Sequence, residues 1–174
     1  MTTFEDYRVL AQRTTNKKLS HREHVANAAL GLCGEAGEVA DALKKAKMQG
    51  HKLDAIKVIE ELGDVMWYCA EAATYLKMIV SWDQAYQSVI DMSVNADGLE
   101  RLAVRLCKCA GAAAEKMMYR RPAVTDLCEV LYIVKTIAAH WGYHIIEVGE
   151  RNIDKLRRRY PDEFDPNRSI NREV

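Results

Sequence analysis

The sequence contains only three prolines among its 174 residues. Proline interrupts helices because it lacks a backbone N–H, so its scarcity leaves long stretches that can be helical. Those stretches are rich in alanine, leucine, glutamate, lysine and methionine, which are good helix formers. We therefore predict an all-α protein, with helices at about 3–13, 23–47, 54–78, 82–92, 98–119, 124–140 and 145–160.

An excess of charge of one sign is also lacking, because 25 Lys and Arg residues balance 25 Asp and Glu residues. This balance argues against a nucleic acid polymer or an anionic membrane as the main partner. No apolar run approaches the ~18 residues of a membrane span, and the N-terminal MTTFEDYRVL has acids where a signal peptide has positive charge. We expect a soluble, cytoplasmic protein.

No C-x-x-C pair occurs among the five cysteines, and their number is odd. Each lies in an apolar helical context, so we interpret all five as small buried residues in a reducing compartment. Two histidine pairs have helical spacing, His21 with His24 and His140 with His144. Either pair could in principle hold a transition metal, but such pairs without further ligands are usually structural or solvated.

A repeated acidic pattern is the main feature that the sequence does contain. In GEAGEVAD and EELGDVMW, Glu35 and Glu38 have the same spacing as Glu61 and Asp64. At about 100° per helical residue, the two acids of each pair lie about 100° and 160° from a reference residue in the apolar stripe. The two pairs are therefore geometrically equivalent.

Each acidic pair encloses a glycine, Gly37 in the first and Gly63 in the second. Glycine inside a helix is roughly 0.5–1 kcal/mol less favourable than alanine. We therefore expect a non-local reason for both glycines, such as the close approach of another backbone or of metal-bound phosphates.

Small, aromatic and cationic residues lie on the same helix faces as the acids of the two motifs. The sector of the first pair contains Asn27 and small residues, and that of the second contains Lys57, Tyr68 and Tyr75. The small residues leave space, while the aromatic rings and the cation form its walls. We interpret Asn27, Lys57 and Tyr68 as candidate substrate-binding residues.

A helical hairpin would bring the four acids together, and the short break around Gly50 favours one. Four carboxylates cannot remain ionised at close range without a strong counter-charge. Oxygen ligands without Cys or His favour Mg²⁺ or Mn²⁺, which binds through carboxylates together with substrate phosphates. A single E-x-x-E is often only a solvated helical face, but two copies with equal offsets favour a metal site. A ferritin-like di-iron site would need Glu-x-x-His, which the sequence lacks.

These motifs resemble those of a known family. The acidic motifs, with 22 residues between Glu38 and Glu61, are similar to the E-x-x-E … E-x-x-D signature of the MazG-like all-α nucleoside triphosphate pyrophosphohydrolases. The segment that runs from Asn152 through Lys155 and Arg159 is similar to the basic stretch that closes the family's domain. The resemblance implies a helical bundle that cleaves between the α and β phosphates, releasing a nucleoside monophosphate and pyrophosphate.

The resemblance also implies the roles of particular residues. Mg²⁺, or Mn²⁺, would be held by the four acids, and Asn152, Lys155 and Arg159 would bind the substrate, although these basic residues could instead form a solvated face. Glu38 is our candidate for the carboxylate that orients or deprotonates the attacking water, but the sequence does not separate it from Glu35. Relatives act on dUTP, dCTP, dGTP or damaged nucleotides, so the base remains open, and a homo-oligomer, a dimer or tetramer, is expected.

A single domain of this family is about two-thirds as long as this chain, and here an extra stretch separates the acidic motifs from the basic motif. That stretch resembles a second copy. In an alignment of the two copies, Cys109 and Ala112 replace the first acidic pair, while Asp126 and Glu129 match the second. The second copy could therefore hardly hold a metal cluster.

We interpret the chain as two units that share one core. Residues 1–94 form the unit with the metal-binding acids, residues 95–164 form a degenerate unit with the basic segment, and residues 165–174 form a loosely held tail. A plain insertion in one longer domain is the alternative. The alternative function is a non-catalytic helical oligomer that binds Mg²⁺ or a nucleotide.

Overall fold

In the computed structural model, the described residues are 1–83 and 98–170, and these contain helices but no strand. The elements in chain order are α1 (Phe4–Ala11), the 3₁₀ helix η1 (Gln12–Thr14), α2 (His21–Met48), α3 (Ala55–Tyr75), α5 (Leu99–Met118), α6 (Val124–His140), α7 (Ile145–Arg159) and α8 (Pro166–Ile170). The all-α prediction is confirmed. The helix predicted over 82–92 lies outside the described residues, except for its first two, which form a bend.

Local hydrogen bonds set the bounds of the two long helices. The Ser20 hydroxyl accepts from the backbone N–H of Glu23, whose carboxylate accepts from the backbone N–H of Ser20, so a capping box begins α2. Asp54 caps α3 by accepting from the backbone N–H of Lys57. Between them Gly50 has a φ of 72°, which glycine adopts readily. The chain therefore reverses direction here, as the sequence predicts.

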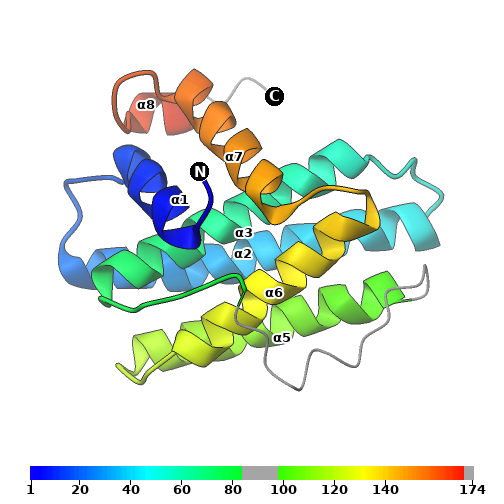
Figure 1. The fold of residues 1–174 in the computed structure, drawn as a ribbon, viewed down its shortest axis with the longest axis horizontal. Coiled ribbons are helices and arrows are strands. Elements are labelled where there is room, and N and C mark those ends of the chain that lie inside the picture. Colours follow the sequence, from blue (N-terminus) through cyan, green and yellow to red (C-terminus); the bar gives the residue numbers. More distant parts are fainter. Residues whose placement is uncertain (84–97, 171–174) are drawn as a thin grey trace.

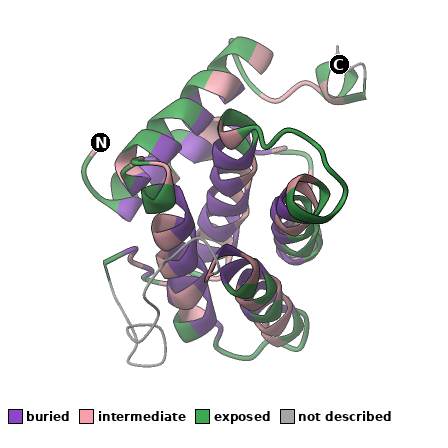
Figure 2. Cartoon of the chain, turned by 90° about the vertical axis from the view of Figure 1, so that its right-hand side faces the viewer, coloured by how far each residue is buried: buried purple, intermediate pink, exposed green. Residues whose placement is uncertain are grey.

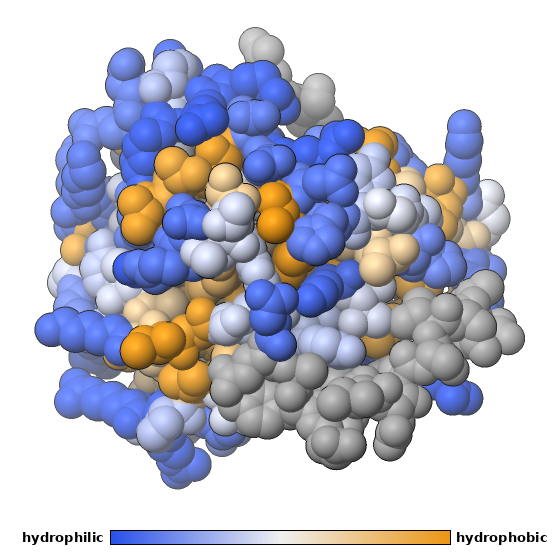
Figure 3. Space-filling view, viewed as in Figure 1, coloured by the Kyte–Doolittle hydropathy of each residue, from blue (hydrophilic) through white to orange (hydrophobic). Residues whose placement is uncertain are grey.

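Two helical hairpins form the centre of the molecule, α2 with α3 and α5 with α6, and α5 also packs along α2. Figure 1 shows α1, α7 and α8 on one side of the α2–α3 hairpin, with α5 and α6 on the other. Figure 2 shows the buried residues on the inward sides of these helices. The face in Figure 3 is mostly hydrophilic, with small hydrophobic patches. None of the described helices combines the length and apolarity that crossing a membrane requires.

The predicted apolar stripes form the core. Leu32 of α2 and Leu62 of α3 are fully buried, together with most of the residues that share their stripes. The cysteine prediction needs correction, because Cys33 is exposed and Cys107 is only half-buried. Both lie at the edge of a stripe, where no neighbouring helix covers them completely. All five cysteines are free thiols.

The chain that follows α7 is tied to the segment between α1 and α2. Arg13 donates to the backbone carbonyls of Pro161 and Asp162 at 2.8 and 3.0 Å. Lys17 forms an ion pair with Glu163 at 2.8 Å. Through these contacts, residues 161–163 lie against the segment between α1 and α2.

The α5–α6 hairpin is consistent with the predicted duplication but does not test it, so the division into two units stays a prediction. The acids that match the metal-binding positions have partners within their own hairpin. Asp126 pairs with Lys116 at 2.6 Å, and the Cys109 thiol donates to Glu129 at 3.3 Å.

Candidate active site

Three carboxylates meet where α2 and α3 face each other. One oxygen each from Glu35, Glu61 and Asp64 lie within 4.8 Å of one another, and all three residues are half-buried. They meet because the antiparallel hairpin places the E-x-x-E turn of α2 beside the E-x-x-D turn of α3. Glu38 lines the same pocket one turn further along α2, but it lies outside this group of three.

The environment of Glu35 and Glu61 opposes the ionisation of these two carboxylates. Burial, followed by the nearby charges of Asp64 and Glu61, raises the pKa of Glu35 to about 7. Burial and the Asp64 charge also raise the pKa of Glu61. Acids that repel one another in a partly desolvated position are stabilised by a cation among them. The cluster therefore has the charge, the oxygen donors and the spacing that suit a hard divalent cation.

Helix α7 fixes the position of Asp64 from the other side. The Lys155 ammonium donates to Oδ2 of Asp64 at 2.5 Å, and the Asn152 amide donates to Oδ1 at 2.9 Å. Asn152 in turn accepts from the Tyr7 hydroxyl at 2.8 Å and is only 2% exposed. The structure thus puts Asn152 behind Asp64, where it orients the carboxylate, and not on the wall of the pocket.

This contact explains one of the two glycines in the acidic motifs. A Cβ at Gly63 would lie 2.8 Å from the Cβ of Asn152, so α7 can approach α3 only because Gly63 has no side chain. A Cβ at Gly37 would have no neighbour within 4 Å. The expectation of a close approach thus holds for Gly63, whereas no other described element comes within 4 Å of a Cβ at Gly37.

A pocket of about 560 Å³ contains the four acids. Of the predicted substrate-binding residues, Asn27, Tyr68, Lys155 and Arg159 line it, whereas Lys57 lines a neighbouring depression. The other lining residues come from α3, from the segment before α2 and from the C-terminal part of the chain: Thr14, Asn16, Leu19, Glu60, Trp67, Leu156, Tyr160, Phe164 and Ser169. A larger hollow of about 850 Å³ lies near the ends of α3 and α5 and has no carboxylate in its lining.

The sequence analysis missed the part of the wall built by segments far apart in the chain. The Trp67 indole donates to the Thr14 hydroxyl at 3.0 Å, which ties the segment before α2 to α3. The ring of Trp67 meets that of Tyr68 edge-on at 5.0 Å. Phe164 reaches the wall through its ring contact with Tyr160 at 5.4 Å. Only Trp67, which adjoins Tyr68 beside the second acidic motif, had a signal in the sequence.

Comparison with known proteins finds one family for part of the chain. The family model of the MazG nucleotide pyrophosphohydrolase domain matches residues 22–95. No curated protein and no solved structure matches the chain. The matched segment contains α3 and all of α2 except its first residue, and with them the four acids Glu35, Glu38, Glu61 and Asp64. Residues 22–95 are therefore similar to the MazG nucleotide pyrophosphohydrolase domain, a family of hydrolases that act on nucleotides.

Proposed function

We propose that the chain hydrolyses a deoxynucleoside triphosphate to the monophosphate and pyrophosphate in a Mg²⁺-dependent reaction. The observation that carries this proposal is the composition of a single pocket. It contains the carboxylate cluster together with Lys155 and Arg159, and it extends to the aromatic side chains of Trp67 and Tyr68. Such a pocket offers opposite charges for a metal and for phosphates, and flat apolar surfaces for a nucleoside.

The carboxylates fit a divalent metal. Glu35, Glu61 and Asp64 would hold Mg²⁺ or Mn²⁺ through oxygens, with Glu38 close enough to share the pocket. When bound, the ion supplies charge that neutralises the triphosphate and acidifies a water molecule. The hydrogen bonds from α7 keep Asp64 in place for this purpose.

Glu38 is the acid that we assign to the attacking water. Its side chain is exposed to the pocket and has no hydrogen bond or ion pair with any described residue. A carboxylate in that state can accept a proton from water as the oxygen attacks the α-phosphorus. Glu35 is less suited to this role, because its carboxylate lies within the group of three.

The basic residues on α7 would bind the phosphates. Lys155 already lies against Asp64, so its ammonium is held between the carboxylate cluster and the remainder of the pocket. Its other N–H groups can donate to a phosphate oxygen. Arg159 lies one turn further along α7 and can bind phosphate through two parallel hydrogen bonds. Together these cations would offset negative charge on the pyrophosphate as it leaves.

The decisive experiment measures pyrophosphate release from a panel of deoxynucleoside and ribonucleoside triphosphates, with Mg²⁺ or with a chelator. We expect release with Mg²⁺ alone, a preference for deoxynucleotides, and loss of activity in Glu35→Gln. Nucleotide binding without pyrophosphate release in any combination would favour the alternative, a non-catalytic nucleotide-binding protein.

We also propose that the chain forms a homo-oligomer, a dimer or tetramer, in the cytoplasm. Large apolar side chains at the surface support an oligomer, since Leu30 is 74% and Ile79 is 92% exposed. Light scattering after size-exclusion chromatography measures the mass of the particle, and a strictly monomeric mass would refute this proposal.

A further inference from the structure

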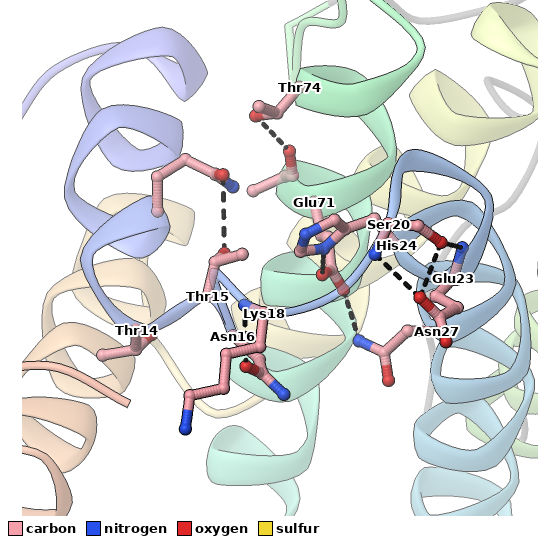
Figure 4. Close-up of polar contacts among 12 residues, drawn as sticks. Thr14, Thr15, Asn16, Lys18, Ser20, Glu23, His24, Asn27, Glu71 and Thr74 are labelled. Carbon is pink, nitrogen blue, oxygen red and sulfur yellow. Dashed lines mark hydrogen bonds and ion pairs between the residues drawn. The ribbon is translucent and has the colours of Figure 1, made fainter. Parts of the chain in front are cut away.

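A buried polar network connects α2 and α3 beside the pocket. Glu71 of α3 is only 1% exposed, and its Oε1 lies 2.9 Å from Nδ1 of His24, which is 2% exposed. Its Oε2 accepts from Nδ2 of Asn27 at 2.6 Å, as Figure 4 shows. The His24 ring stacks on the Tyr75 ring with 3.6 Å between centroids. Of these residues, only Asn27 lines the pocket.

The hydrogen bond between Oε1 of Glu71 and His24 determines what Oε2 of Glu71 can do. If Glu71 is ionised, Nδ1–H of His24 donates to Oε1. If Glu71 is neutral, its proton lies on Oε1 and is donated to Nδ1. In both arrangements the shared proton lies between Oε1 and Nδ1, so Oε2 remains an acceptor. His24 therefore keeps the oxygen that faces Asn27 free of a proton.

An acceptor at that place fixes the orientation of the Asn27 amide. An amide group can turn its oxygen or its nitrogen toward a partner, and only the nitrogen can donate to Oε2 of Glu71. The Asn27 oxygen must then point away from Glu71, as it does in Figure 4. No described residue donates a hydrogen bond to that oxygen, and the residue lines the pocket. The pocket thus has an acceptor whose direction is set from the core.

The position of this acceptor matches the nucleoside end of a substrate. Asn27 precedes Glu35 by eight positions on α2, which corresponds to about 12 Å along the helix axis. Tyr68 lies on the adjacent part of α3, with its ring against Gly31, where a Cβ would come within 2.1 Å of it. A triphosphate at the carboxylates would therefore extend its sugar and base past Tyr68 toward Asn27.

We propose that Asn27 is a specificity-determining residue that accepts a hydrogen bond from the nucleoside part of the substrate, and that Glu71 and His24 are positioning residues that orient its amide. This inference rests on the proposed function. The group recognised is a donor, either an N–H of the base or a hydroxyl of the sugar. A nucleotide that presents only acceptors there would leave the Asn27 oxygen unpaired, and losing one such hydrogen bond lowers kcat/KM by about 10- to 100-fold.

Three variants test the assignment. Asn27→Leu removes the acceptor, and Glu71→Gln allows the Asn27 amide to turn either way while preserving the volume of the buried side chain. The matched control is Asp126→Asn, which alters another carboxylate that is 9% exposed and paired, but lies outside the pocket. Each variant is measured for kcat and KM with the nucleotide panel, and for inhibition by inorganic triphosphate, which has no nucleoside.

We expect Asn27→Leu and Glu71→Gln to raise KM about 10-fold or more for the preferred nucleotide, with little change in kcat. The differences in kcat/KM between nucleotides with different bases should become smaller, and the affinity for inorganic triphosphate should be retained. Asp126→Asn should change none of these. Two substrate analogues then identify the donor, one with a 3′-deoxy sugar and one with a methylated base N–H. Asn27→Leu should leave KM unchanged only for the analogue that lacks the donor group.

The inference is overturned if the wild-type protein releases pyrophosphate selectively and both variants keep its KM and its order of preference. That result would leave the proposed function standing. If the wild-type protein hydrolyses no triphosphate, the proposed function fails. The role of Asn27 is then tested by calorimetry, in which the affinities of the wild-type protein and of Asn27→Leu for the same nucleotides are compared. Should Glu71→Gln fold poorly, Asn27→Leu decides, because Asn27 is only half-buried.

Discussion

Replacing Gly63 by alanine adds one methyl group at the contact between α3 and α7. That methyl would lie 2.8 Å from the Cβ of Asn152 and 3.1 Å from its amide nitrogen. The Cβ cannot swing aside by a change of rotamer, so α7 itself must move away from α3. Asn152 and Lys155 are the residues that bind Asp64 from α7, and such a movement would loosen both hydrogen bonds.

Two effects of opposite sign determine the change in stability of Gly63→Ala. Overpacking a tight contact typically destabilises by about 1–3 kcal/mol. The better helix propensity of alanine offsets up to ~1 kcal/mol of this. We expect a net loss of about 1–2 kcal/mol, which corresponds to a fall in Tm of about 2–8 °C for a chain of this length. We also expect activity to fall about 10-fold or more, because the carboxylate is displaced.

Gly37→Ala is the matched control, since it makes the same substitution in the equivalent motif. At that position no other described element lies within 4 Å of the new Cβ. It should raise stability by up to ~1 kcal/mol. Thermal unfolding by circular dichroism, in chelator to exclude metal effects, compares the two variants directly. If Gly63→Ala is as stable as the wild-type protein and fully active, then the close approach of α7 is not the reason for this glycine.

Four further results are expected. Glu38→Gln should leave folding nearly unchanged, because the residue is exposed, and should lower kcat by ~10²-fold or more; undiminished turnover would remove Glu38 from the mechanism. Mg²⁺ at 100 times its Kd should stabilise the protein by about 2.7 kcal/mol, seen as a higher Tm, and an unchanged Tm would argue against a formed site. Lys155→Ala should weaken nucleotide binding, as calorimetry measures it. The metal affinity of the nucleotide-free protein should be kept or rise, because the Lys155 ammonium repels a metal ion at Asp64. A parallel loss of both affinities would contradict this. Burial raises the pKa of Glu35 from 4.5 to about 7, so between these pH values the metal-free folded protein retains a proton that the unfolded chain releases. The free energy of unfolding should therefore fall as the pH rises from about 4.5 to 7. Urea titrations at several pH values measure this dependence, and Glu35→Gln should reduce it.

Local periodicity was sufficient to predict the helices and the acids that share their faces. The stripes around Leu32 and Leu62 follow from 3.6-residue spacing alone, and the short connection at Gly50 indicates how the two helices pair. Cys33 was wrongly assigned to the core because a helical wheel gives the direction of a side chain but does not show whether a neighbour covers it. Coverage depends on the placement of α5, which lies far along the chain.

The remainder of the pocket depends on contacts without a local signal. Lys17 and Glu163 are 146 positions apart, and no spacing rule relates the segment before α2 to the segment after α7. Asn152 was predicted to bind substrate because it lies in the basic motif. In the structure its side chain packs on Gly63, and its amide donates a hydrogen bond to Asp64. Glu71 and His24 lie outside every motif, and their pairing becomes visible only when both helices are in place.

The contacts between Asp64 and α7 also determine at which stage of folding the site forms. Asn152 and Lys155 are 88 and 91 positions from Asp64, so joining them closes a very long loop. On a ribosome, which releases the chain from its N-terminal end, the carboxylates emerge well before the cation that accompanies them. Helical signal should therefore return early in refolding, from the local α2–α3 hairpin, whereas nucleotide binding should return only with the slowest phase, when α7 docks.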